Sequence, residues 1–410
     1  MSALPAAAED VRMIERDHTP NAGTGLLGPN FSRRNRQAPT DDGAGDGRWI
    51  AIDESGYNGD QLSGRDRYMT LGSVAVDDTE AAGIVDTLRR EAGIQKTAPE
   101  VKFQKMFTGG GAGARRRLLA EILGPDGPLD GRASVYIIDT HYFVMAKLVD
   151  LLLEERFHRM GYDIVSNGVA RQLARDVTTE GTRALGRDGF DRFVSTAVGF
   201  FSKKNRTGDQ ISVDDLYTVI GESCAYARRR KAPQAKKAAV VLEMLRAARP
   251  EAEAFARERP AEATPAGPYG LLDDSLDPLI TAVPTVVLHA SARHGGKIHA
   301  LADDQRLLTD DKLDVLERGA IAVGMVRGLV EGGHLVDLVR GRSVDHPSLQ
   351  LADLVAGAGR AVARRHDGEE DPAGDDLHPV VIPLVDPEGL FLHEEPERLA
   401  TVDRARAQRR

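Results

Sequence analysis

The stretch Ile50–Gly56 (IAIDESG) constrains the fold of this 410-residue chain more than any other. The apolar run over residues 49–52 favours a strand buried on both faces, and the Ser-Gly pair that follows favours a turn. Two carboxylates, Asp53 and Glu54, stand where the strand ends. In an open α/β sheet that edge is the usual place for a ligand. We therefore expect Asp53 either to open the turn or to contribute to a site there.

A second constraint is a helix predicted to start near Pro347, with Ser348 as its candidate N-cap. Nearly every residue from Leu349 to Ala358 is apolar or small, so the helix should be buried almost all round. Asp353 lies in its middle, with no Lys or Arg within one helical turn. A buried carboxylate needs a partner, which predicts a metal ion or a base from elsewhere in the chain. Small residues should let this helix press closely against a sheet: Ala352, Ala356 and Gly357.

A third apolar run, over residues 133–138, predicts another buried strand, and it ends at Asp139. If this strand lay beside the first one, Asp139 would come close to Asp53. A helix between the two strands would allow such a parallel crossover. Asp139 can equally be the N-cap of a helix that starts near Thr140, and the sequence leaves both interpretations open.

Two further acidic elements complete the pattern. Residues 297–302 predict a strand that ends at Asp303 and Asp304, either of which can belong to a site. Glu100 and Lys102 flank a valine in an extended pattern, and this alternation would place both side chains on one face. They form either part of a site or an ordinary salt-bridged strand edge.

The middle of the chain, residues 141–258, carries helical stripes of apolar residues and no clustered acids, which predicts an all-helical region at 141–265. Clusters of basic residues interrupt it and predict either solvated helix faces or a surface that follows nucleic-acid phosphates. The candidate nucleic-acid contacts are Lys203, Lys204, Arg206, Arg228, Arg229 and Arg230. The composition of residues 1–47 predicts a disordered N-terminal tail. Residues 366–410 are predicted to form a peripheral C-terminal tail.

Composition excludes several classes of protein. Cys224 is the only cysteine, so disulfides within the chain and thiolate zinc sites are excluded, and a cytoplasmic setting is expected. No apolar run reaches about eighteen residues, so no membrane span or membrane partner is expected. The start of the chain lacks the pattern of a secretion signal. A net charge of −9 excludes a globally basic nucleic-acid binder but allows a local basic face.

Four motifs occur in order along the chain: IDESG at 52–56, EVKF at 100–103, ADDQ at 302–305 and SLQLADLVAG at 348–357. Together they resemble the family called domain of unknown function 3800, whose members look like ribonuclease-H-like nucleases. The resemblance covers residues 48–140 and 296–363. It implies an α/β fold, a ribonuclease-H-like mixed sheet flanked by helices, built from 48–140 and 266–365. The helical region 141–265 would then be a large all-helical insertion, which departs from the family pattern.

Carboxylates without thiolates select hard cations, so Mg²⁺ or Mn²⁺ is the expected cofactor. Two such ions about 4 Å apart can activate a water and stabilise the leaving oxygen of a phosphodiester. The resemblance implies this mechanism, with Asp53 bridging two ions and Lys102 orienting a phosphate. It further implies the acids that complete the metal shells: Asp353, Asp303 or Asp304, and either Glu100 or Asp139.

The predicted function is therefore a metal-dependent nuclease whose partner is DNA or RNA. A non-catalytic nucleic-acid-binding or interaction protein on the same fold is the main alternative, and the presence of every candidate acid argues against it. An actin-like ATPase would need glycine-rich phosphate loops after its strands. The segment Asp53–Gly56 has a single glycine and no second copy, which argues against that activity.

Overall fold

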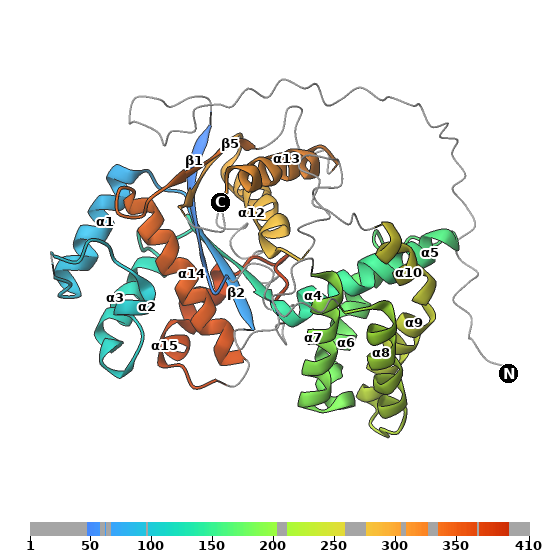
Figure 1. Ribbon diagram of the computed structural model, residues 1–410. Coiled ribbons are helices and arrows are strands. Elements are labelled where there is room, and N and C mark those ends of the chain that lie inside the picture. Colours follow the sequence, from blue (N-terminus) through green and yellow to red (C-terminus); the bar gives the residue numbers. More distant parts are fainter. Residues whose placement is uncertain are drawn as a thin grey trace. The chain divides into compact units, whose positions relative to one another are not determined.

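The computed structural model describes residues 47–57, 62, 67–95, 97–202, 211–258, 276–304, 309–326, 335–366 and 369–392. Nearly all of the predicted N-terminal tail and residues 393–410 lie outside these ranges. The described part contains a five-stranded sheet with helices on both faces (Figure 1). Its strands are β1 (Arg48–Ser55), β2 (Tyr68–Val74), β3 (Ala133–Asp139), β4 (Ile298–Asp303) and β5 (Leu335–Gly341).

The sheet is mixed, with the strand order β3-β2-β1-β4-β5. β2 runs antiparallel to both β1 and β3, whereas β4 pairs in parallel with β1 and with β5. Within this sheet β2 therefore runs against the other four strands. The expectation of a mixed sheet flanked by helices is confirmed, and each apolar run that predicted a strand forms one.

The strand order separates two carboxylates that side-by-side strands would have brought together. β2 lies between β1 and β3, so Asp53 pairs with Gly72, and Gly72 pairs on its other edge with Val135. Asp139 follows Val135 by four residues. It therefore lies about 13 Å along the strand direction and about 10 Å across the sheet from Asp53.

One face of the sheet is covered by α14 (Pro347–His366), the helix that carries Asp353 (Figure 1). The predicted close approach is confirmed at Gly72, where an added Cβ would lie 2.4 Å from backbone atoms of Ala352 and Ala356. The Thr70 hydroxyl also donates to the Ala356 carbonyl oxygen at 2.7 Å. α14 contacts α1 (Asp78–Glu91), α2 (Phe103–Met106) and α15 (Pro372–Val381), and α3 (Gly113–Leu123) packs against α1 and α15.

The start of α14 differs from the sequence-based expectation, because Ser348 lies inside the helix rather than at its N-cap. The Asp78 carboxylate of α1 accepts hydrogen bonds from Ser348 N at 3.1 Å and from Ser348 Oγ at 2.6 Å. An acid at this end also interacts favourably with the helix dipole. A side chain from another helix thus caps α14 and fixes where it begins.

The opposite face of the sheet packs against α12 (Pro278–His294) and α13 (Asp310–Val326). Between β3 and α12 the described residues form helices and turns. These are α4 (Thr140–Leu148), the π-helix η2 (Val149–Glu154), α5 (Glu155–Arg159), α6 (Val169–Leu185), α7 (Arg187–Phe201), α8 (Val213–Arg228), α9 (Pro233–Ala247) and α10 (Arg249–Glu258). Their apolar stripes join the hydrophobic cluster on this face of the sheet.

Alternation along the strands decides which side chains face α14. In β1, Ile50 and Ile52 pack in the cluster on the α12 face, whereas Ala51 packs in the cluster on the α14 face. Asp53 therefore faces α14. In β4 the same alternation directs Leu301 and Asp303 toward α14.

The end of the described chain packs into the same structure. α15 contacts α14 and α3, and Leu384 and Val385 are buried in the cluster on the α14 face. Val385 and Leu390 form isolated parallel bridges with β3. Residues 372–390 of the segment predicted to be peripheral thus help to close the sheet at β3.

Candidate functional site

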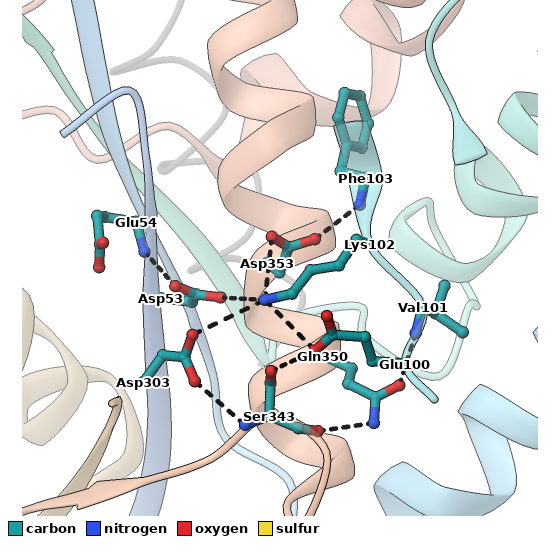
Figure 2. Close-up of polar contacts among 10 residues, drawn as sticks. All are labelled: Asp53, Glu54, Glu100, Val101, Lys102, Phe103, Asp303, Ser343, Gln350 and Asp353. Atoms are coloured by element: carbon teal, nitrogen blue, oxygen red, sulfur yellow. Dashed lines mark hydrogen bonds and ion pairs between the residues drawn. The ribbon is translucent and has the colours of Figure 1, made fainter. Parts of the chain in front are cut away.

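Four of the six predicted acids converge on a single lysine ammonium. Lys102 Nζ lies 3.7 Å from Asp53 Oδ2, 3.7 Å from Asp353 Oδ1, 3.8 Å from Asp303 Oδ2 and 3.9 Å from Glu100 Oε2 (Figure 2). These distances exceed the range of direct hydrogen bonds. One positive charge is thus shared among four carboxylates rather than bonded to any one of them. We call these five side chains the carboxylate cluster.

The cluster forms because four separate segments meet on the α14 face of the sheet. Asp303 ends β4, whereas β1 continues past Asp53 to Ser55, two residues beyond the predicted strand end. The two acids lie on neighbouring parallel strands, and Asp353 projects toward them from the middle of α14 (Figure 2). Lys102 is held in an extended conformation just before α2 (φ −120°, ψ 134°). Because Lys102 and Glu100 alternate with Val101, both side chains turn toward the cluster, as predicted from the sequence.

The charges in the cluster do not balance, since four carboxylates face one ammonium. Asp53 is buried, and only one of its oxygens has a hydrogen-bond donor, the Glu54 N–H at 2.8 Å. Among the described residues its other oxygen, Oδ2, has no hydrogen-bond partner. A buried acceptor without a donor is costly and rare in folded proteins. The cluster therefore has the character of a site that attracts a further cation.

The pKa values of these groups reflect the same imbalance. Burial, reinforced by the charges of Glu54, Asp353 and Asp303, raises the pKa of Asp53 well above its ordinary value. Burial and then the charge of Asp303 raise the pKa of Glu54 to about 8. Burial likewise raises the pKa of Asp353, although Lys102 and the Phe103 N–H oppose the shift.

The pKa of the Lys102 ammonium is also raised, but here the neighbouring charges rather than burial are the cause. Burial by itself would lower the pKa of its ammonium, but the charges of Asp53, Asp353, Asp303 and Glu100 raise it overall. Lys102 therefore stays protonated and acts as the built-in counter-charge of the cluster.

Two polar residues that the sequence analysis did not select hold the acids in place. Ser343, in the turn after β5, donates its N–H to Asp303 Oδ1 at 3.1 Å and its hydroxyl to Glu100 Oε2 at 2.6 Å. Gln350 of α14 accepts the Val101 N–H at 2.9 Å and donates to the Ser343 carbonyl oxygen at 2.7 Å. Both side chains are buried. Gln350 lies one helical turn before Asp353, a signal that could have been read from the sequence, whereas Ser343 has no such signal.

Asp353 is fixed by a backbone donor as well as by Lys102. Its Oδ2 accepts the Phe103 N–H at 2.7 Å, and the Phe103 ring packs where Gly357 leaves room on α14. The sequence left a metal ion or a distant base open as the partner of Asp353, and the structure places a base there, Lys102, from 251 positions away in the chain.

Two of the predicted metal ligands lie outside the cluster. Asp139 caps α4 by accepting the His141 and Tyr142 N–H groups, and it forms a two-point ion pair with Arg67 at 3.0 and 2.7 Å. Its carboxylate is fully used there, so Glu100, and not Asp139, joins the other acids. Asp304 follows Asp303 and pairs with Arg340 at 3.5 Å. Strand alternation turns it away from α14.

The predicted nucleic-acid contacts lie in the helical region, and only three of them fall within the described residues. Lys203, Lys204 and Arg206 lie outside those residues. Arg228 pairs with Glu243 at 2.7 Å, Arg229 is exposed, and the exposed Arg230 stacks on Tyr226.

The kind of ligand in the cluster suits a divalent metal ion, but the present spacing of the side chains does not. Carboxylate oxygens are the ligands that Mg²⁺ and Mn²⁺ prefer, and Asp53 Oδ2 lacks a hydrogen-bond donor, so the cluster fits a divalent cation in kind. As the side chains stand, no group of three or more His, Cys, Asp or Glu residues in the described ranges is spaced to hold one. Lys102 Nζ lies among the oxygens instead.

Comparisons with known proteins add no relative. No model of a known protein family matches the chain, and no curated protein or solved structure does. Within the described ranges, no helix is both long enough and apolar enough to cross a bilayer.

Proposed function

We propose that this protein is a metal-dependent nuclease that hydrolyses phosphodiester bonds of DNA or RNA at the carboxylate cluster. The observation that carries the proposal is the convergence of four carboxylates from separate segments around one ammonium, with a buried Asp53 oxygen that lacks a donor. Excess negative charge buried at the ends of parallel strands is unfavourable unless cations bind there.

The topology supports a ribonuclease-H-like assignment for the sheet. The order β3-β2-β1-β4-β5, with β2 antiparallel to its neighbours and β1, β4 and β5 parallel, is the arrangement expected of that fold. On this assignment residues 141–265 are an all-helical insertion that follows β3. The cluster then lies where the first and fourth strands end, next to the last helix of the core.

Asp53, Asp303, Asp353 and Glu100 are the residues that would hold one or two Mg²⁺ or Mn²⁺ ions. When bound, such ions supply a nucleophilic water and stabilise charge on the leaving oxygen. Asp53 is the central ligand because it is the most buried of the four acids. Asp303 and Glu100 are kept in position by Ser343, and Asp353 by the Phe103 N–H.

Lys102 has two roles in this proposal. Without metal it limits repulsion among the acids, since its ammonium is within 4 Å of each of them. With metal bound, its flexible side chain is able to turn toward a phosphate oxygen of the substrate. Lysine commonly contacts phosphate as a point charge.

A purely structural salt-bridge cluster on a nucleic-acid-binding or interaction protein is the second candidate, and the central position of Lys102 favours it. The charge count argues against it, because four carboxylates share a single ammonium. A structural role also does not explain a buried Asp53 oxygen that has no donor among the described residues.

The test is cleavage of labelled single- and double-stranded DNA, RNA and hybrids with Mg²⁺ or Mn²⁺. Asp53→Asn and Asp353→Asn keep the side-chain shape but lose the charge that a metal needs, so both should abolish cleavage. Asp304→Asn is the matched control, since this acid lies beside Asp303 but outside the cluster. Full cleavage by a folded Asp53→Asn protein, or loss of cleavage only in Asp304→Asn, would overturn the proposal.

A further inference from the structure

A pocket in the helical region combines an apolar floor with a basic rim. It has a volume of about 700 Å³ and lies between α5, α9 and the end of α8. This volume falls within the range of pockets that bind small molecules or parts of larger ligands. The floor is made by Phe157, Ala227, Ala239, Val240, Met244 and Ala247.

The floor exists because α9 has apolar residues on two faces. One face, which includes Ala238, Leu242 and Leu245, is fully buried against neighbouring helices. The other face runs along the pocket, and there Val240 is 52% exposed. A surface helix normally presents polar residues on its outer face. An apolar outer face beside a pocket therefore indicates a ligand with an apolar part.

The rim carries positive charge that the protein only partly neutralises. Two rim cations have acidic partners, Arg228 with Glu243 at 2.7 Å and Arg156 with Glu251 at 3.7 Å. Arg230 and Lys236 also line the pocket, and in the described part of the chain neither has a carboxylate within 4.0 Å. In a chain of net charge −9, two uncompensated cations at one pocket indicate an anionic ligand.

An aromatic ring, that of Tyr226, stands beside Arg230. Arg230 lies over the Tyr226 ring, 4.9 Å from its centroid, and donates to the Tyr226 hydroxyl at 2.8 Å. The Tyr226 side chain is 44% exposed, so part of its surface remains open to solvent. Apolar and aromatic surface next to arginine and lysine suits a flat base attached to a phosphate.

We propose that this pocket binds a single-stranded segment of nucleic acid. A base lies against Val240 and Met244 on the floor, and the flanking phosphates contact Arg230 and Lys236 at the rim. The site is separate from the carboxylate cluster. Binding of nucleic acid at this pocket requires neither a metal ion nor cleavage. The proposal can therefore be tested whether or not the protein is a nuclease.

The experiment measures anisotropy of a fluorescein-labelled oligothymidylate of about twelve nucleotides, in chelator so that no metal-dependent cleavage occurs. The pocket variant is Arg230→Glu with Lys236→Glu. The matched control is Arg187→Glu with Lys237→Glu, which makes the same change in charge at two exposed positions that neither line the pocket nor belong to the candidate nucleic-acid contacts.

We expect the pocket variant to raise Kd about tenfold or more and to lower the slope of log Kd against log salt by about 1.4, the value for two lost phosphate contacts on a single strand. The control should change Kd less than about threefold, because screened charges away from the ligand contribute little. Circular dichroism of both proteins checks that they are folded.

A second arm tests the base. An oligonucleotide of the same charge but with abasic sites should bind the wild-type protein about tenfold more weakly, because it has no base to bury against the apolar floor. Val240→Asp should remove this preference. Equal losses in the two double variants would mean diffuse electrostatic attraction and would overturn the proposal. Unchanged binding in the pocket variant would overturn it as well, and would leave the pocket to an amphiphilic anion or an acidic peptide.

Discussion

Replacing Lys102 by methionine tests the physical basis of the carboxylate cluster most directly. The substitution keeps a long apolar side chain and removes the ammonium that lies within 4 Å of all four acids. At an effective dielectric constant near 20, each such contact is worth about 4 kcal/mol before desolvation is counted. The full sum cannot be lost, because an acid that loses its partner can take up a proton instead.

The expected cost therefore depends on pH. At pH 8 the acids are forced toward ionisation, and the loss should approach the lower end of the range for breaking a buried ion pair, about 3 kcal/mol. Because the pKa values of Asp53 and Asp353 are raised, these acids take up protons more readily as the pH falls, so the loss should be smaller at pH 5 than at pH 8. Urea denaturation in chelator at both pH values measures the difference.

Lys105→Met is the matched control for this experiment, because Lys105 is exposed and has no ion pair among the described residues. It should leave stability nearly unchanged at either pH. Mg²⁺ should stabilise Lys102→Met more than the wild-type protein, since a bound cation supplies the missing charge. A Lys102→Met cost that is below about 1 kcal/mol at pH 8, or that does not vary with pH, would refute the reasoning.

Three further predictions follow from the same geometry. Asp353→Asn removes one of four repelling charges, and its amide oxygen can still accept the Phe103 N–H. The metal-free protein should therefore be as stable as wild type or more so, and most of the Mg²⁺-induced rise in melting temperature should disappear. A large loss of stability with the Mg²⁺ effect intact would contradict this. Glu54 has a pKa of about 8 in the folded protein against about 4.3 when unfolded, so the folded state binds more protons in this window and stability falls as pH rises through it. Glu54→Gln should accordingly gain stability relative to wild type between pH 5 and pH 8, and a constant difference in urea midpoints would count against the shift. Gly72→Ala should lower the free energy of unfolding by about 3 kcal/mol or more, because its Cβ would lie 2.4 Å from backbone atoms of α14. Gly83→Ala is the control, since its Cβ would meet open space, and thermal melts should show it to be neutral or stabilising.

Much of the candidate site could be predicted from local sequence, because the apolar pattern of each strand or helix indicates which of its side chains are buried. The apolar run that stops at acids identified the end of β4, whereas β1 continues two residues past Asp53 to Ser55. An acid within an apolar helix identified Asp353. The requirement that Asp353 find a distant base or a metal followed from the cost of burying a charge. These features are local, since they depend on the side chains of one strand or one helix.

The tertiary structure decided which of these acids meet. Because β2 lies between β1 and β3, Asp139 is too far from Asp53 to join the carboxylate cluster. The alternation of side chains along β4 turns Asp303 toward the cluster, whereas Asp304 pairs with Arg340. Neither follows from a single element, because a one-residue change of register would turn every side chain to the other face.

The partners of the acids were likewise settled only by long-range packing. Lys102 reaches Asp353 because α14 lies across the ends of β1 and β4, and Ser343 joins Asp303 to Glu100 from a turn that has no distinctive sequence. The sequence by itself determined that acids stand near the ends of strands and within an apolar helix. The fold decided that they share one ammonium, because loops and strand order, rather than local pattern, bring residues so far apart in the chain within 4 Å of each other.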